Sequence, residues 1–325
     1  MNETRRTLLS AFETGPATGP ELADELGVSR AAVWKQVDAL REAGFEIENT
    51  PDGYAVTSVP AYGAAAIEYE LDAPYRVEYH DSIGSTNDRA RELAAAGDRD
   101  IVVVADEQTG GRGRLERSWD SPPGGIWAST VLDPSLPAAH VPLITLAAGV
   151  AVVDACRDVG VEATLKWPND VLVGDDTDTE RDDTDTTDDD DRGGQKLSGI
   201  LTEMEGEADR VSWLLVGIGL NANIAREALP DGATSLQEQV GAVDRRAVLQ
   251  TMLESLSTLV ADPDTIIERW RAYSSTLGRA VRVDTGREQI EGEAIDIQFP
   301  GALVVDTDSG EEVVHAGDCE HLRPV

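Results

Sequence analysis

Lysine is rare in this 325-residue chain, and its three positions are the first places to look for chemistry. Lys166 ends a predicted strand within Lys-Trp-Pro-Asn-Asp170, and Lys196 begins another within Lys-Leu-Ser-Gly-Ile-Leu201. A lysine side chain is costly to bury unless it meets an anion. The alternative is a strand-end lysine whose ammonium simply reaches water. Because the chain has so few lysines, we favour a functional role for Lys166 and Lys196.

A glycine-rich segment with two arginines, Gly110-Gly-Arg-Gly-Arg114, is the second candidate. It lies between a predicted strand that ends at Glu107 and another near Trp127. Glycines leave backbone N–H groups open to a phosphate, and arginines add forked donors. No helix follows it as a dinucleotide-binding turn requires, and it does not end in the Gly-Lys-Ser/Thr of a P-loop. On its own, the segment is equally compatible with a flexible surface turn that carries solvated arginines.

Other polar residues give weaker signals. Ser85-Thr-Asn87 precedes a predicted helix and, on its own, is typical of an N-cap. Asn221 follows the glycine-rich end of a strand, and Trp119 follows the arginine segment, where its ring would stack on a base or pack in the core. The four histidines lack the spacing of metal ligands and are interpreted as structural or surface residues: His80, His140, His315 and His321.

The charge balance indicates where the protein works. The chain has 62 Asp and Glu residues against 27 Lys and Arg residues, a net charge of −35. Such a charge repels itself in dilute buffer, whereas at about 1 M salt the screening length is only about 3 Å. The acidic excess and the near-absence of lysine predict a halophile's cytoplasm. An acidic tract at residues 175–191 has no apolar residue and is predicted to form a disordered surface loop within 174–195.

The cysteine and hydropathy patterns point to a reduced, cytoplasmic chain. Cys156 and Cys319 are too few and too far apart for a disulfide framework or a metal site. The longest apolar run, Val141–Val153, contains Pro142 and is shorter than the ~20 residues that a membrane span needs. We therefore expect no membrane association.

The elements that must position these residues predict an α+β multidomain chain. Residues 1–60 read as three short helices and a hairpin around Thr50-Pro-Asp-Gly53, the pattern of a winged helix-turn-helix DNA-binding domain. Residues 63–276 mix strands and helices without strict alternation, which favours a mixed-sheet catalytic domain. Residues 277–325 have short β-type runs between glycines and predict a small SH3-like β-barrel.

In their order along the chain, the motifs resemble those of the biotin protein ligases, also called biotin–[acetyl-CoA-carboxylase] ligases. That order is Ser85-Thr-Asn, Gln108 before Gly-Arg-Gly-Arg114, Lys-Trp-Pro-Asn-Asp170, Lys-Leu-Ser-Gly-Ile-Leu201 and Gly-Ile-Gly-Leu-Asn221. Lys-Trp-Pro-Asn-Asp is specific to this family, and the order supports the weaker motifs. With its winged-helix front, the chain is similar to the bifunctional, BirA-type group, which also represses transcription. The resemblance covers nearly the whole chain except the acidic tract.

The resemblance implies a two-step reaction. The carboxylate of biotin attacks the α-phosphate of ATP and releases pyrophosphate, and a lysine of a biotin carboxyl carrier protein then attacks the biotinyl-5′-AMP. Such chemistry needs positive groups at the developing oxyanion charge, Mg²⁺ on the phosphates, and exclusion of water. Biotin, ATP and Mg²⁺ are therefore the expected small molecules. Operator DNA and a homodimer are the further associations that the BirA-type group suggests.

The resemblance also assigns residues position by position. The biotin-binding set would be Ser85, Thr86, Asn87, Gln108, Arg112, Gly113, Arg114, Lys166 and Gly199. The nucleotide-binding set would be Arg117, Trp119, Lys196 and Asn221. Lys166 would bridge the biotin carboxylate and the α-phosphate as the main catalyst, while Arg112 and Arg114 would lie in a loop over the adenylate. Leu115-Glu116 follows Arg114 where bacterial members are more basic, which predicts weaker retention of the intermediate.

The DNA-binding role depends on the front domain. Its predicted recognition helix runs from Ser29 to Leu40, and Ser29, Arg30, Lys35 and Gln36 are expected to contact DNA. Residues 1–60 hold 5 basic and 10 acidic residues. With about 5 phosphate contacts, raising salt from about 0.15 to 3 M would weaken binding by roughly six decades. DNA binding would then rest on base contacts, shape and dimerisation, and the alternative is a relict domain that serves stability.

Two other functions stay open at this point. One is a ligand-sensing DNA-binding regulator without transfer activity, which the intact Lys166 and Arg112 disfavour because sensing needs no phosphate cradle. The other is a lipoate or octanoyl transferase on a related fold, which the Lys-Trp-Pro-Asn-Asp motif and the C-terminal barrel disfavour.

Overall fold

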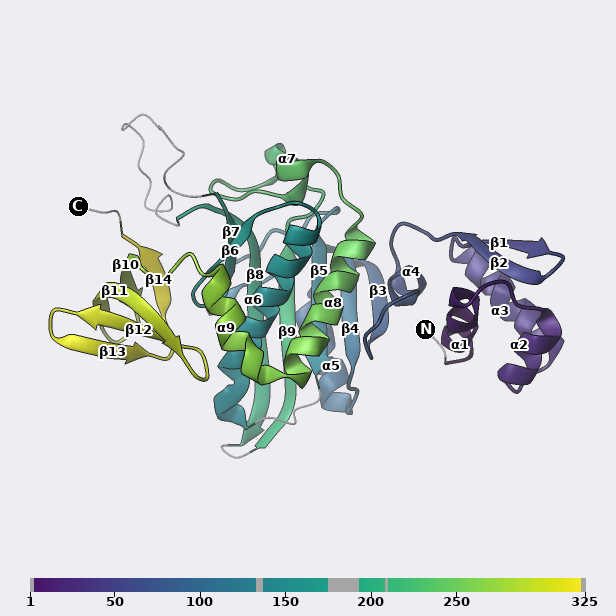
Figure 1. Cartoon of the computed structure of the whole chain (residues 1–325), viewed down its shortest axis with the longest axis horizontal. Coiled ribbons are helices and arrows are strands. Elements are labelled where there is room, and N and C mark those ends of the chain that lie inside the picture. The colour runs from purple at the N-terminus through teal and green to yellow at the C-terminus, as the bar shows by residue number, and fades with distance from the viewer. Residues whose placement is uncertain (1–2, 133–136, 175–192, 208–209, 323–325) are drawn as a thin grey trace.

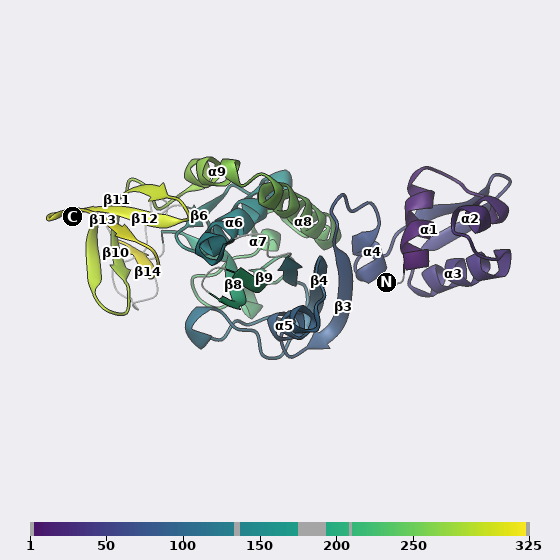
Figure 2. The same ribbon diagram turned by 90° about the horizontal axis from the view of Figure 1, so that it is seen from below.

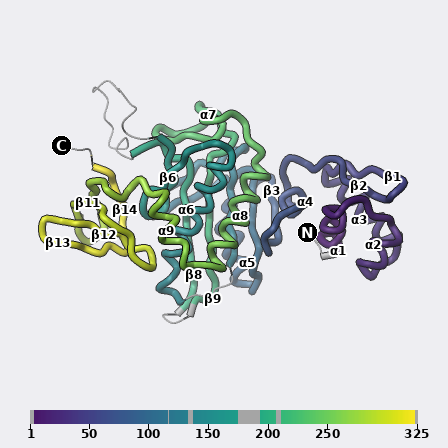
Figure 3. The backbone as a smooth tube through the Cα atoms, viewed as in Figure 1, coloured from purple at the N-terminus to yellow at the C-terminus, as the bar shows by residue number. Residues whose placement is uncertain are grey.

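The computed structural model describes residues 3–132, 137–174, 193–207 and 210–322. Within these ranges the chain forms three units in a row, namely a helical unit at the N-terminus, a central sheet covered by helices, and a small C-terminal sheet (Figure 1). Figure 3 shows the N-terminal and C-terminal units on opposite sides of the central one. The predicted α+β multidomain class is confirmed. The predicted acidic loop falls mainly on residues 175–192, outside the described residues, and the predicted domain limits stay predictions.

The N-terminal unit is the predicted winged helix-turn-helix. Its elements are α1 Glu3–Glu13, α2 Gly19–Glu25, α3 Arg30–Glu42, β1 Glu46–Thr50 and β2 Gly53–Ser58. Thr18 and Glu21 form a capping box at the start of α2, each side chain accepting from the other's backbone N–H. Ser29 caps α3 by accepting from Ala32 N–H at 3.2 Å. These caps fix where the two helices begin.

The hairpin turn differs from the predicted Asp-Gly turn by one residue. Thr50 pairs with Gly53, so the two central turn residues are Pro51 and Asp52. Gly53 has a φ of +120°, and a Cβ there would lie 2.2 Å from the carbonyl oxygen of Ala17. Glycine is therefore required at position 53 because the wing packs directly against the segment that leads into α2.

A short helix that the sequence analysis did not predict, α4 (Ala64–Glu68), joins the front unit to the central one. Tyr69 at its end is buried in the core of the N-terminal unit, whereas Ile67 is buried in the core of the central unit. The buried Glu68 carboxylate accepts from the backbone N–H of Val77 at 2.6 Å and pairs with Arg6 of α1 at 3.3 Å. The joint is thus packed on both sides, and a buried charge links α1 to the first strand of the central sheet.

The central unit is built on a seven-stranded sheet in the order β3-β4-β5-β9-β8-β7-β6. The strands are β3 Arg76–Ile83, β4 Ile101–Gln108, β5 Ile126–Leu132, β6 Ala163–Lys166, β7 Asp170–Val173, β8 Gln195–Glu207 and β9 Arg210–Leu220. β3 and β4 are parallel, and every other neighbouring pair is antiparallel. The mixed sheet is as predicted. Its strand β5 is buried along its whole length because helices cover both faces of the sheet.

Four helices cover this sheet. They are α5 Thr86–Ala96 on one face, and α6 Val141–Asp158, α8 Arg245–Ala261 and α9 Ile266–Tyr273 on the other (Figure 2). A short helix, α7 (Leu236–Val240), lies near the ends of the strands. The predicted helix over 265–276 ends earlier, at Tyr273. The end of β4, the end of β6 and the start of β8 carry predicted site residues, namely Gln108, Lys166 and Lys196.

The helical stretch around α6 is longer than the apolar run seen in the sequence. It covers Ala138–Asp158, 21 residues, and is long and apolar enough to cross a membrane by length and composition. However, 67% of its apolar window is buried within the protein, because α6 is the central helix of the core. Its hydropathy is therefore explained by packing against the sheet and α8.

The C-terminal unit is a five-stranded antiparallel sheet in the order β13-β12-β11-β10-β14, in agreement with the predicted SH3-like fold. Its strands are β10 Ala280–Asp284, β11 Gln289–Gln298, β12 Ala302–Thr307, β13 Gly310–Val314 and β14 Asp318–His321. The last strand was not predicted. The Trp167 indole Nε1 donates to the carbonyl of Gly301 at 3.0 Å, and His321 contacts Thr276 at 3.1 Å. These contacts fix the small sheet beside the end of β6.

Candidate functional site

A cavity of about 1140 Å³ opens where the strand ends meet β14 and the arginine loop, which is the loop that carries the Gly110–Arg114 segment. Every residue that was predicted to bind biotin or nucleotide lines it. Residues of the C-terminal unit, among them Asp318 and Cys319, line it as well. The volume is slightly above the usual range of a ligand pocket. The structure therefore brings the predicted residues together in one place.

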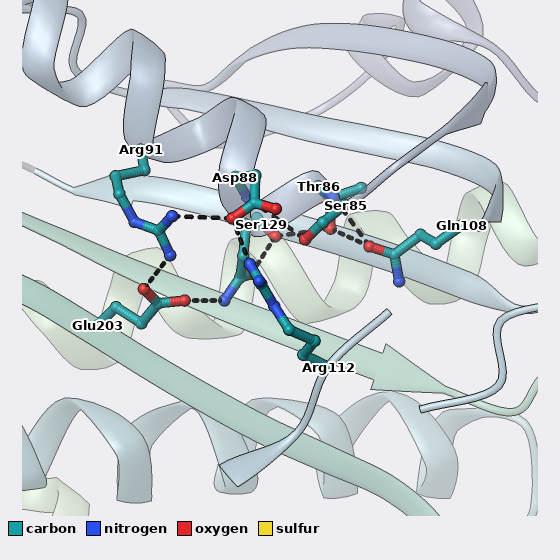
Figure 4. A network of polar contacts seen from close by, with 9 residues as sticks. Ser85, Thr86, Asp88, Arg91, Gln108, Arg112, Ser129 and Glu203 are labelled. Carbon is teal, nitrogen blue, oxygen red and sulfur yellow. Dashed lines mark hydrogen bonds and ion pairs between the residues drawn. The ribbon is translucent and has the colours of Figure 1, made fainter. Parts of the chain in front are cut away.

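The Ser85-Thr86-Asn87 segment forms the start of α5 and one wall of the cavity. Ser85 caps the helix, so its N-cap role holds irrespective of any ligand. Thr86 donates from its backbone N–H and its hydroxyl to Gln108 Oε1, at 2.8 and 2.9 Å. Gln108 in turn donates to Ser121 Oγ at 3.0 Å. These bonds set the orientation of Gln108 without any ligand (Figure 4).

Asn87 lies deeper in the same wall and is buried. Its Nδ2 donates to Glu203 Oε1 at 2.8 Å, and its Oδ1 accepts from Ser129 Oγ at 2.5 Å. Ser129 is completely buried in β5, and Glu203 lies on β8. Gly217 of β9 lies directly under Asn87, since a Cβ at that position would be 2.2 Å from Asn87 Oδ1. The cavity wall thus contains the Asn87 amide, which protein hydrogen bonds hold in place and which can bond to a small polar ligand.

Lys166 ends β6, and its side chain lies in the cavity wall rather than in open water, because the residue is only 7% exposed. The next residue, Trp167, is buried and donates from its backbone N–H to Thr276 Oγ1 at 3.0 Å, which fixes the strand end. Burial raises the pKa of the Cys319 thiol to about 12, and the nearby Lys166 ammonium opposes that rise. A buried ammonium is therefore placed between the central sheet and β14.

The arginine segment folds back on itself at the cavity mouth. The backbone N–H of Gly113 donates to the carbonyl of Arg117 at 2.8 Å, and that of Trp119 donates to Gly111 at 2.9 Å. A single 3₁₀ turn, Arg114–Glu116, lies between these bonds. The prediction that no regular α-helix follows the glycines is confirmed.

Each guanidinium of this segment has protein partners. Arg112 pairs with Asp88 of α5. Arg114 donates to Asn169 Oδ1 at 3.0 Å and pairs with Asp318 at 3.2 Å, while Arg117 pairs with Asp318 at 3.0 Å. The side chains in these pairs are partly exposed, so each pair is worth little in water. An anion that enters the cavity therefore competes with Asp88 and Asp318 for these guanidinium groups.

Trp119 and Lys196 lie on the sheet side of the cavity. The Lys196 ammonium pairs with Asp170 at 2.7 Å and is 5.2 Å from the centre of the Trp119 ring. The ring packs over two glycines, since a Cβ at Gly199 or Gly219 would lie 3.1 Å or 2.8 Å from it. The indole Nε1 is buried without a hydrogen-bond partner in the described part of the chain. Trp119 therefore packs on the strand and also offers an unused donor.

Asn221 lines the cavity, but its side chain is committed to the protein. The residue is 5% exposed, and its Nδ2 donates to the carbonyl of Thr234 at 3.0 Å. Its predicted contact with adenine stays a prediction.

Sequence reasoning missed Asp318 of the cavity lining and two residues that hold a lining residue in place. Glu203 and Ser129 orient Asn87, and Asp318 holds two of the loop arginines. Ser129, a polar residue in the largely apolar strand Ile126–Leu132, was a usable signal, because a buried hydroxyl needs a hydrogen-bond partner. Asp318 gave no signal, since β14 itself was not predicted.

The residues of α3 that were predicted to contact DNA differ in how exposed they are. Arg30 and Lys35 are exposed as predicted, and Ser29 acts as the N-cap. Gln36 is half-buried and accepts from Arg5 Nε at 3.3 Å, and its predicted contact with DNA stays a prediction. Trp34, which the sequence analysis passed over, is 56% exposed beside a shallow groove between α3 and the wing.

Three family models match the chain. Residues 4–55 match the HTH domain, residues 79–221 match the Biotin/lipoate A/B protein ligase family, and residues 276–322 match the Biotin protein ligase C terminal domain. These segments correspond to the three units of the fold. The second covers the strands and loops from which most of the cavity is built.

Individual proteins match over most of their length. The Bifunctional ligase/repressor BirA of Bacillus subtilis is 34% identical over 93% of this chain and 93% of its own length. A Biotin--[acetyl-CoA-carboxylase] ligase of Mycobacterium tuberculosis is 34% identical over 74% of this chain and 86% of its own. Among solved structures, the biotin protein ligase from Aquifex aeolicus in complex with biotin and ATP superimposes with a TM-score of 0.61 at 26% identity, over 76% of this chain and 99% of that one.

Proposed function

The chain belongs to the biotin protein ligase family, and on that premise we propose that it joins biotin to a lysine of a biotin carboxyl carrier protein, with ATP as the energy source. The observation that carries this proposal is the buried Lys166 ammonium in the cavity that the arginine loop closes. A charge in this position suits a reaction that brings two anions together. The related Aquifex aeolicus enzyme holds biotin and ATP.

Biotin would bind along the wall formed by the start of α5. Asn87, Thr86 and Gln108 offer both donors and acceptors that protein hydrogen bonds already orient. Preorganised groups of this kind bind a polar ring without losing side-chain entropy. The carboxylate end of biotin would then point toward Lys166.

Lys166 would act in the first step. Attack of the carboxylate on the α-phosphate of ATP forms a bond between carboxylate oxygen and phosphorus and breaks the bond to pyrophosphate. The ammonium would reduce the repulsion between the two anions and stabilise the charge that develops on the phosphoryl oxygens. Because Lys166 is mostly out of water, its charge acts through a lower dielectric than a surface lysine.

The arginine loop would act by covering the intermediate. A mixed anhydride hydrolyses in water, so the site must be closed until the acceptor lysine arrives. Arg112 and Arg114 already reach both α5 and β14 across the cavity mouth. The acceptor amine would attack the acyl carbon, and AMP would leave with the electron pair.

Mg²⁺ would neutralise phosphate charge on ATP. Within the described ranges, no three metal-ligating side chains come together. In such sites the ion is usually bound by one or two carboxylates together with the nucleotide's phosphates. Asp170 is a carboxylate in the cavity lining, although Lys196 already pairs with it. We expect Mg²⁺ to enter with ATP.

The winged-helix unit supports a second activity, repression of transcription in the cytoplasm through DNA. Arg30, Trp34 and Lys35 are exposed together on α3. An exposed tryptophan supplies an apolar contact that salt does not screen, whereas lysine and arginine contacts to phosphate are lost at high salt. The operator and the expected homodimer stay predictions.

The test is transfer of labelled biotin to a purified carrier domain in molar KCl. We expect label on the carrier only when ATP is present. Lipoate in excess should not compete, because the chain also matches the Biotin protein ligase C terminal domain. Failure of transfer together with tight biotin binding would instead support a regulator without transferase activity, and competition by lipoate would support a lipoate transferase.

A further inference from the structure

Asp88 connects the arginine loop to the polar wall of the cavity (Figure 4). Its carboxylate, in the first turn of α5, pairs with Arg112 of the loop and, at 2.8 Å, with Arg91. Arg91 in turn pairs with Glu203 of β8, which accepts from Asn87 Nδ2 at 2.8 Å. Two cations and two anions therefore alternate from the cavity mouth to its wall.

The contact between Asp88 and Arg112 is an exposed ion pair that can break without leaving a carboxylate of this network unpaired. The two side chains are 45% and 36% exposed, and exposed pairs contribute little. When Arg112 leaves, Asp88 keeps Arg91 as a partner, and Arg91 keeps Glu203. Release of Arg112 thus leaves no carboxylate of the network without a cation. An anion in the cavity can take over Arg112 at low cost.

We propose that Asp88 is a positioning residue that holds Arg112 at the rim of the cavity until an anionic reactant replaces it. The proposal rests on the proposed function, because the competing anion is the phosphate of ATP or of the adenylate. Arg91 determines how firmly Asp88 holds the loop, since it shares the same carboxylate. Asp88 touches no reacting atom and acts only through Arg112.

Two substitutions are expected to act in opposite directions. Asp88→Asn removes the competing charge, so ATP should bind about two- to fivefold more tightly, the range that an exposed ion pair supplies. Arg91→Gln removes the second cation from Asp88, so Arg112 should be held more firmly and ATP should bind less tightly. A purely structural role would weaken binding in both variants.

A matched control comes from the same helix. Arg89 is 35% exposed and pairs with Glu78 and Glu92, away from the cavity residues. Arg89→Gln should therefore leave the reaction with ATP unchanged. Thermal unfolding of all variants distinguishes a folding defect from a change in the site.

The experiment is biotin-dependent exchange of labelled pyrophosphate into ATP, which gives KM for ATP and kcat for the full-length chain. We expect KM to fall for Asp88→Asn, to rise for Arg91→Gln, and to stay constant for Arg89→Gln. The Asp88→Asn effect should shrink as KCl screens the pair.

An unchanged or raised KM in a folded Asp88→Asn protein would overturn the proposal. If that variant does not fold, Arg91→Gln decides, and an unchanged or lowered KM would refute it. Absence of any biotin-dependent exchange in the wild type would instead refute the proposed function itself.

Discussion

Substitution of Gly217 by alanine is a direct test of the polar wall. Gly217 lies in β9 under Asn87, and the added Cβ would be 2.2 Å from Asn87 Oδ1 and 2.9 Å from its Nδ2. Side-chain carbons essentially never approach this closely, so Asn87 has to move. It cannot move without breaking its bonds to Ser129 or Glu203, at 2.5 and 2.8 Å.

The magnitude follows from what Asn87 loses. Overpacking at a buried position costs about 1–3 kcal/mol of folding free energy. A ligand hydrogen bond lost in a buried site costs a similar amount, which corresponds to a roughly 10- to 100-fold rise in the Kd of biotin. Ser129 keeps Thr86 as a partner at 2.8 Å, so the fold should survive.

The assay is calorimetric titration of biotin with thermal unfolding of the same samples. Gly84→Ala is the control, because a Cβ there meets nothing within 4 Å, although the residue adjoins Ser85. We expect weak biotin binding for Gly217→Ala and near-normal binding for Gly84→Ala. If folded Gly217→Ala binds biotin as tightly as the wild type, Asn87 does not hold the ligand, and the reasoning about this wall is wrong.

Three further predictions concern stability. Glu68→Ala removes the acceptor of the buried Val77 N–H and the partner of Arg6. The free energy of unfolding should therefore fall by about 2–4 kcal/mol in guanidinium titrations. An unchanged free energy would show that Glu68 does not stabilise the connection between the front and central units. Burial raises the pKa of both Cys156 and Cys319 to about 12, so neither thiol should react with a disulfide reagent at pH 8 in the folded protein. Because unfolded thiols ionise from about pH 8.5, stability should decline as the pH rises from there toward 12, and rapid labelling at pH 8 would contradict the burial. Because salt screens the repulsion within a chain of net charge −35, the melting temperature should rise as KCl is raised toward about 1 M. An unchanged melting temperature would contradict the predicted halophilic origin.

Much of the fold could be predicted because local signals were strong. The capping box at Thr18 and the cap at Ser29 are encoded within a few residues, and the structure has both. The elements that were missed are short and depend on distant partners. α4 exists because each of its sides packs on a different core, and β14 exists because it pairs with β10. Neither condition is visible in a window of sequence.

The site residues also divide into those with a local sequence signal and those that depend on distant partners. Lys166 and the arginine segment could be found because lysine is rare and glycine is informative. The partners of Arg114 and Asn87 could not be found, because Asp318 and Glu203 reach them from strands far away in sequence. The contact of Gln36 with Arg5 of α1 could not be predicted, because the helix pattern alone does not show it.

The most direct test of the account is the burst of pyrophosphate released when Lys166→Ala protein is mixed with biotin and ATP. Lys35→Ala is the matched control, since that lysine lies on α3, outside the cavity lining. Removal of a preorganised charge at a developing oxyanion costs about 100- to 1000-fold in rate. We predict that Lys166→Ala folds with a near-normal melting temperature but loses the burst by at least this factor, whereas Lys35→Ala keeps it. A near-normal burst from the folded Lys166→Ala protein would contradict the central claim.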